Sequence, residues 1–184
     1  MTRAGTCLLL AALLAALLLC PIKSLANADD TDGSWRHLAA PSLGASLELP
    51  RSWALRIRRD LGPRKSYRGV SAREANGRCW LVAVRLPAGN PARNLEEAME
   101  LAKECFLEGC DLVDIRDRRH HAMTGITCHG HGPVDGQDAR FVLVVARNPL
   151  GGGYIAVYVA GERDHFSEFE ALSRRIIDSL KPLA

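Results

Sequence analysis

The chain of 184 residues carries 24 Lys and Arg against 21 Asp and Glu, a formal net charge of +3 at pH 7. A chain so close to neutral does not bind polyanions through its overall charge. Its length suits a single domain with a hydrophobic core. Beyond the N-terminal segment, no stretch is apolar enough to span a membrane as a helix.

The first 28 residues have the pattern of a cleavable export signal. Arg3 gives a positively charged start, and Leu8–Leu19 is an unbroken run of Leu and Ala. This run is shorter than the ~20 apolar residues that cross a bilayer as a helix. Ala26-Asn27-Ala28 has the small-x-small pattern of a cleavage site. We therefore predict a signal peptide over residues 1–28 and a periplasmic or secreted mature protein.

A lipid anchor at Cys20 is the alternative form of export. Cys20 directly follows the apolar run, where a lipidated cysteine would stand. Leu19 occupies the position before it, which in lipoprotein signals is normally Gly, Ala or Ser, so we favour export without a lipid.

The first part of the mature chain predicts a tether and then strands. Residues 29–44 are polar, contain Gly and Pro and lack an apolar period, so they predict a flexible N-terminal tether. A single domain over residues 45–184 follows. Alternating apolar residues predict a strand, a turn and a second strand with one buried face, then two further strands. These strands cover residues 45–49, 53–58, 65–74 and 79–86. The last is apolar on nearly both faces, as expected of a central strand covered from two sides.

The second part predicts two helices around four strands. Asn94 is a suitable N-cap for a helix over residues 95–106, with Gly109 as C-cap. Asp164 is the predicted N-cap of a last helix that ends near Leu180. The strands between the helices cover residues 111–118, 125–131, 141–147 and 154–160, with a Gly-rich turn over 149–153. This order predicts an α+β fold, an antiparallel sheet flanked by helices.

Four cysteines remain after the signal: Cys79, Cys105, Cys110 and Cys128. An even number in an oxidising compartment predicts two disulfides, with three connectivities that the sequence leaves open. Buried free thiols are the alternative. Because Cys105 shares the apolar stripe of its helix, we expect it to face the sheet and to bond to Cys79 or Cys128.

Histidines and a cysteine gather within a dozen residues, at His120, His121, Cys128, His129 and His131. In a strand, His129 and His131 point to one face, where neutral imidazoles can hold Zn²⁺ or Cu²⁺. The segment lacks a second ligand pair and a nearby carboxylate to complete a first shell. We therefore predict exposed histidines and no bound metal, and keep a metal-binding protein that uses His129 and His131 as the alternative.

Basic residues are concentrated in two segments, at Arg51, Arg56, Arg58, Arg59, Arg64, Lys65 and Arg68, and again at Arg116, Arg118 and Arg119. The simplest interpretation is a solvated strand face. Few aromatic residues stand between these charges, which argues against a nucleic-acid surface. An acidic protein partner or an anionic membrane surface remains as the kind of partner they would fit.

Sequence signatures of catalysis are absent. The glycines of Gly151–Gly153 lead into a strand, whereas a phosphate-binding loop leads into a helix N-terminus. The chain has no Gly-x-Ser-x-Gly and no His-Glu-x-x-His segment. We predict no catalytic residue, no cofactor and no enzyme activity. The interpretation that remains is a binding or adaptor module that acts through a protein partner.

The order of elements resembles the PsbP/Mog-like family. Leu47-Glu48-Leu49-Pro50-Arg51-Ser52-Trp53 is similar to its opening strand, which ends in Pro before a Trp. The helix after Asn94, the strand at Gly125, the Gly-turn hairpin and a last helix from Phe166 to Ile176-Ile177-Asp178-Ser179-Leu180 follow its usual order. The resemblance implies an α/β/α sandwich around an antiparallel sheet and an adaptor role. It supplies no common active site, and the four cysteines depart from the family pattern.

N-terminal sequencing of the exported protein tests the signal. We expect the mature chain to begin at Asp29, because the small residues Ala26 and Ala28 fit the peptidase before that bond. A mature chain that begins at a lipid-bearing Cys20 would contradict this prediction and place the protein on a membrane.

Overall fold

The computed structural model describes residues 34–61, 67–86, 92–148 and 153–183, without the side chains of Arg119, His120, Phe166 and Glu168. The predicted signal peptide, Arg64, Lys65 and most of the predicted Gly-rich turn lie outside these residues. In the part of the chain that is described, no helix is long and apolar enough to cross a membrane.

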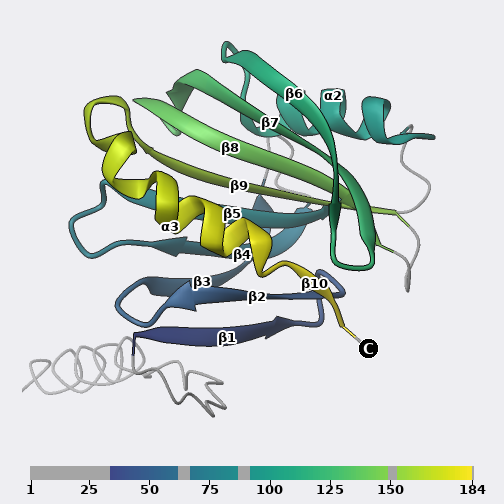
Figure 1. Ribbon diagram of the computed structural model, residues 1–184, viewed down its shortest axis with the longest axis horizontal. Helices are drawn as coiled ribbons and strands as arrows, with labels where there is room; N and C mark the ends of the chain where they lie inside the picture. The colour runs from purple at the N-terminus through teal and green to yellow at the C-terminus, as the bar shows by residue number, and fades with distance from the viewer. Residues whose placement is uncertain (1–33, 62–66, 87–91, 149–152, 184) are drawn as a thin grey trace, which may run out of the picture.

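A seven-stranded antiparallel sheet forms the centre of the fold, in the order β3-β4-β5-β9-β8-β7-β6 (Figure 1). Each strand pairs with its neighbour in antiparallel register. The strands are β3 (Ala54–Leu61), β4 (Tyr67–Arg73), β5 (Cys79–Leu86), β6 (Asp111–His120), β7 (Met123–Val134), β8 (Gln137–Arg147) and β9 (Tyr154–Glu162). This arrangement confirms the predicted α+β class and its antiparallel sheet.

Both faces of the large sheet are buried in its middle. Along β5, Cys79 and Leu81 belong to one core and Trp80 and Val82 to the other, because successive side chains of a strand point to opposite faces. Helix α2 (Leu95–Phe106) packs on the Trp80 face and α3 (Phe166–Asp178) on the Cys79 face. The prediction that β5 is covered from both sides is confirmed.

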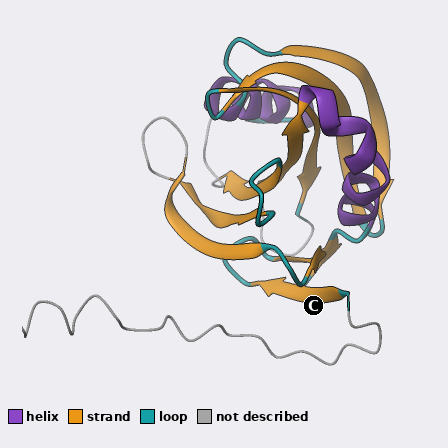
Figure 2. Cartoon of the chain, turned by 90° about the vertical axis from the view of Figure 1, so that its left-hand side faces the viewer, coloured by secondary structure: helices purple, strands orange, loops and turns teal. Residues whose placement is uncertain are grey.

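A second sheet of three strands lies beside α3, in the order β1-β2-β10 (Figure 2). Its strands are β1 (Trp35–Ala40), β2 (Ala45–Pro50) and β10 (Lys181–Pro182). The predicted tether therefore contains an edge strand, which pairs with β2 along its whole length. The guanidinium of Arg175 in α3 lies 3.9 Å from the centre of the Trp35 ring, a cation–π contact that holds β1 in place.

The predicted strand, turn and second strand with one shared buried face are also corrected. β2 and β3 follow each other in the chain but belong to different sheets. Trp53, in the turn between them, is buried in the core on the α3 side, and β3 becomes an edge strand of the large sheet. Ile57 of β3 is 69% exposed in consequence, although its alternation with arginines suggested a buried face.

The helix caps predicted from the sequence are confirmed in part. The Asn94 side chain accepts a hydrogen bond of 2.8 Å from the backbone N–H of Glu97, as predicted for the N-cap of α2. Gly109 has a φ of 78°, but the C-cap is Leu107. The predicted cap at Asp164 is wrong, because a short 3₁₀ turn (Arg163–His165) precedes α3 and places His165 at the cap position.

Two polar side chains join the two sheets. The buried Asn148 amide, after β8, donates to the carbonyl oxygens of Leu43 and Gly44, at 3.3 and 3.4 Å, in the turn between β1 and β2. Ser179, at the end of α3, accepts a hydrogen bond of 2.8 Å from the backbone N–H of Glu48 in β2. The small sheet is therefore fixed to the end of β8 through Asn148 and to the end of α3 through Ser179.

Replacing Asn148 by Ala should lower the free energy of unfolding by about 1–3 kcal/mol, because it leaves the carbonyl oxygen of Leu43 without this buried donor. The carbonyl oxygen of Gly44 keeps a second donor, the backbone N–H of Leu183. Urea unfolding of the variant and the parent measures the difference. Asn76→Ala is the control, since that amide is exposed and its loss should cost less. An equal loss in both variants would show that Asn148 does not join the sheets.

Candidate binding cleft

The histidines singled out in the sequence do not come together in one metal site. His129 and His131 lie on the face of β7 opposite Cys128, as their alternation predicted, but they are half-buried and not exposed as expected. His121 lies at the β6–β7 turn, where its Nε2 atom is 2.9 Å from the carbonyl oxygen of Asp178. The His120 side chain lies outside the description. Within the described ranges, no three His, Cys, Asp or Glu side chains come close enough to hold a metal ion.

All four cysteines are free thiols, so the predicted disulfide from Cys105 is not formed. Cys79 belongs to the core on the α3 side, whereas Cys128 belongs to the core under α2. The sheet therefore lies between Cys79 and Cys105, which is on α2. Sequence alone could not tell which face Cys79 occupies, because β5 is apolar on both.

The thiols on the α2 side each have a different neighbour. The Cys105 thiol donates to the Tyr67 hydroxyl at 3.4 Å, and the Cys128 thiol points to the Met99 sulfur at 4.0 Å. Cys110 donates to the carbonyl oxygen of Pro133 at 3.6 Å. Burial raises the pKa of Cys128 to about 11 and of Cys79 to about 12, and it raises that of Cys110. These buried thiols are poor nucleophiles and poor metal ligands, which act as thiolates.

The basic residues do not form one patch. The arginines of β3 and those of β6 lie at opposite edges of the large sheet. At the β6 edge two of the arginines are paired within the chain. Arg116 binds Asp114 and Arg118 binds Asp178, each at 2.6 Å.

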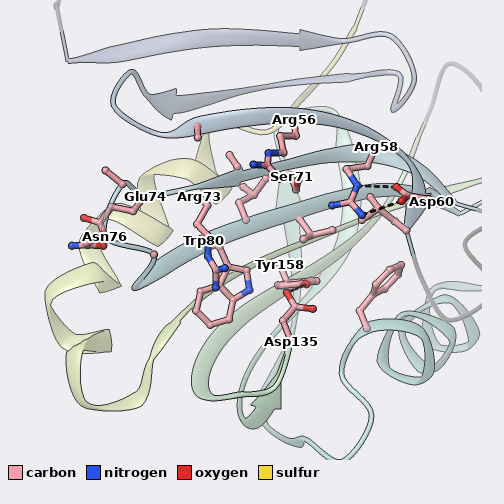
Figure 3. Close-up of a pocket in the computed structure, with 18 of the residues that line it drawn as sticks. Arg56, Arg58, Asp60, Ser71, Arg73, Glu74, Asn76, Trp80, Asp135 and Tyr158 are labelled. Atoms are coloured by element: carbon pink, nitrogen blue, oxygen red, sulfur yellow. Dashed lines mark hydrogen bonds and ion pairs between the residues drawn. The ribbon is translucent and has the colours of Figure 1, made fainter. Parts of the chain in front are cut away.

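An open cleft of about 750 Å³ lies on the α2 side of the sheet, next to β3 (Figure 3). It exists because α2 packs mainly on β7, β8 and β9 and reaches β4 at Tyr67, which leaves side chains such as Arg56 and Arg73 on this face exposed. The end of α2, with Cys105 and Phe106, forms one wall, and the turn after β4 closes one end. β3 forms the outer edge.

Strand register places the lining side chains in rows across this face. Residues directly opposite each other on neighbouring strands share a face of the sheet. The first row runs over Ala54, Arg73 and Trp80. The second row runs over Arg56, Ser71, Val82 and Tyr158. The cleft therefore has guanidinium groups near its open edge and aromatic rings toward its interior.

Two of the three lining arginines have no acidic partner. Arg58 is neutralised by Asp60, at 2.7 Å (Figure 3). The Arg73 guanidinium lies 5.0 Å from the Trp80 ring centre and donates to the neutral Gln137 amide at 3.0 Å. Arg56 is exposed, and no carboxylate of the described residues pairs with it or with Arg73. Uncompensated positive charge is thus concentrated on neighbouring positions of β3 and β4.

Among the described residues, the acidic groups of the cleft form no ion pair with Arg56 or Arg73. The Tyr158 hydroxyl donates to Asp135 at 3.4 Å, and burial, together with the charge of Asp135, raises the pKa of Tyr158. Glu74 lies at the end of the cleft with Asn76 (Figure 3). Its Oε2 atom is buried and has no hydrogen-bond partner among the described residues.

The described residues that line the cleft include groups suited to binding. No histidine is among the described residues that line it, so Ser71 has no imidazole base there. The Cys105 thiol is hydrogen-bonded to the Tyr67 hydroxyl. Arginine with an aromatic ring instead provides charge, donors and apolar contact together. Sequence reasoning singled out Arg56 but missed Arg73, Trp80 and Tyr158. Only the register across β3, β4, β5 and β9 shows that they are neighbours.

No protein-family model matches the chain, and no curated protein matches it. Among solved structures, it is similar to cyanobacterial PsbP (CyanoP) from Synechocystis sp. PCC 6803, with a TM-score of 0.59 at 12% identity. That match covers 84% of this chain and 96% of the other. A Pseudomonas aeruginosa protein of unknown function matches at a TM-score of 0.47 and 15% identity, over 82% and 98% of the two chains. The chain has a PsbP-like fold, as its sequence resemblance implied.

Alkylation of the folded protein at pH 8 should modify Cys105 first. At that pH a pKa of about 12 leaves about 1 thiol in 10⁴ of Cys79 as the reactive thiolate. Cys128 is likewise disfavoured, with a pKa of about 11. Mass spectrometry of modified peptides measures the order. All four cysteines should react after unfolding without reductant, and a disulfide-linked peptide from the exported protein would contradict the structure.

Proposed function

We propose that the chain is an exported, non-catalytic binding module that acts through a protein partner, and that a segment of the partner lies in the cleft beside β3. The observation that carries the proposal is the composition of this cleft, which combines uncompensated guanidinium groups with aromatic rings and has no histidine among its described lining residues. The N-terminal signal pattern and the PsbP-like fold support it.

The shape of the cleft favours a chain segment over an enclosed small molecule. Small-molecule pockets bury most of the ligand surface. Here Ala54, Arg56 and Arg73 line the cleft and are exposed, so a bound group would stay open to solvent along β3. An extended segment can lie along such an open strand edge and continue beyond it.

The distribution of arginines favours a protein partner over an anionic membrane surface. A membrane attracts a contiguous basic surface. The arginines of β3 and β6 lie at opposite edges, and Arg116 and Arg118 of β6 are paired with aspartates. The positive charge that remains uncompensated in the cleft is confined to Arg56 and Arg73, on adjacent strands beside Trp80.

Site-specific photocrosslinking in the native host tests the proposal. A photoreactive residue at Ala54, exposed and in the cleft, should give one discrete adduct with a partner protein. The same residue at Ala39, exposed on β1 of the small sheet, is the matched control and should give none.

Filling the cleft provides the second arm of this experiment. Ser71→Trp places a large ring on the floor between Arg56 and Val82, and an aromatic residue is well tolerated in a strand. The Ala54 adduct should disappear in this variant while its folding is unchanged. An adduct that persists with the cleft filled, or equal adducts from Ala39 and Ala54, would overturn the proposal.

A further inference from the structure

We infer that the cleft recognises an acidic, extended segment of its partner, with two carboxylates at alternate positions bound by Arg56 and Arg73. This inference rests on the proposed function and specifies the chemistry of the partner. It is carried by the charge state and relative positions of these two arginines.

The spacing of the arginines matches alternate residues of an extended chain. Arg56 of β3 is opposite Ser71 of β4, and Arg73 stands two residues further along β4. The two arginines are therefore diagonal neighbours on adjacent strands, about 7–8 Å apart at the backbone. Side chains at positions i and i+2 of an extended peptide lie on the same side about 6.6 Å apart, a similar spacing that long side chains can adjust. Such a peptide, laid along β3 and β4, places one carboxylate near each guanidinium.

The surroundings favour carboxylates that are well separated from each other. Arg73 is held against Trp80 by cation–π contact and by its bond to Gln137, so its remaining N–H groups are fixed in direction. The Ser71 hydroxyl lies between the two arginines in register and can donate a further hydrogen bond. Guanidinium groups bind carboxylates through paired N–H donors.

The rim of the cleft disfavours ligands of dense negative charge. Asp60, Glu74 and Asp135 line it together with Arg56, Arg58 and Arg73, so acids and bases are balanced overall. A nucleic acid carries a charge on every residue of its backbone and would meet these acids along the cleft. A segment with two separated carboxylates meets only the two uncompensated arginines.

The floor of the cleft strengthens these contacts. Val82, Trp80 and Tyr158 are buried side chains that form an apolar surface beneath the arginines. Charges that pair over such a surface are screened less than a pair fully surrounded by water. Salt should nevertheless weaken the complex, because both arginines reach solvent.

Titration of the exported, isotope-labelled protein with synthetic octapeptides, followed by NMR, tests the inference. The first peptide carries Glu-Thr-Glu in a Gly/Ser sequence, the second replaces both Glu by Gln, and the third carries adjacent Glu-Glu. We expect the first to shift the indole N–H signal of Trp80 and to bind at least five-fold more tightly than the other two. Its affinity should fall as salt is raised.

Charge reversal on β3 supplies matched variants. Arg56→Glu should reduce binding of the first peptide at least five-fold. Arg59→Glu makes the same change of charge on the same strand, but Arg59 is exposed and outside the cleft, so binding should be unchanged. Both sites are on the surface, and the spectra themselves report whether each variant is folded.

The outcomes separate this inference from the proposed function. Equal binding of the Glu and Gln peptides, equal binding of the adjacent pair, or equal effects of the two β3 variants would overturn the inference. If none of the peptides binds while the Ala54 adduct forms and is lost in Ser71→Trp, the binding function stands and the acidic partner segment is wrong. If no peptide binds and no Ala54 adduct forms, both the inference and the proposed function are overturned.

Discussion

The central strands of the large sheet must bury side chains on both of their faces, and this constraint determines the rest of the fold. Neighbours such as Cys79 and Trp80 lie in different cores, on opposite sides of the same strand. Each face therefore needs its own cover. One face receives α2, and the other receives α3 together with the small sheet. The amide of Asn148 and the hydroxyl of Ser179 then fix that second cover in place.

The cleft exists because α2 covers its face of the large sheet only in part. Six spacings between seven strands amount to about 29 Å across the sheet, whereas a helix is about 10 Å wide with its side chains. A single helix over β7, β8 and β9, whose end contacts Tyr67 of β4, cannot also shield the rest of β3 and β4. The side chains of these two strands that line the cleft include three arginines and a serine, so this face tolerates water and suits the charged segment proposed for it.

Local patterns in the sequence predicted much of this fold and little of the cleft. The helix after Asn94 and the doubly covered strand β5 depend on neighbouring residues, and both were predicted. The sequence predicts a tether where the strand Trp35–Ala40 forms. This strand depends on pairing with β2 and on contact with Arg175, which are decided by tertiary packing. The sequence likewise did not show which face of the sheet Cys79 occupies. Arg73 and Trp80 become a site only through the pairing of β4 with β5, which no local pattern encodes.

The small sheet also has a consequence for the order in which the protein folds. Its middle strand β2 pairs on one side with β1, next to it in the chain, and on the other with β10, which contains Lys181 near the C-terminus. Contacts between residues so distant in sequence form slowly, because a long loop must close first. Sheet completion therefore requires β10, which follows every other described strand in the chain. Until β10 pairs with it, one edge of β2 remains open.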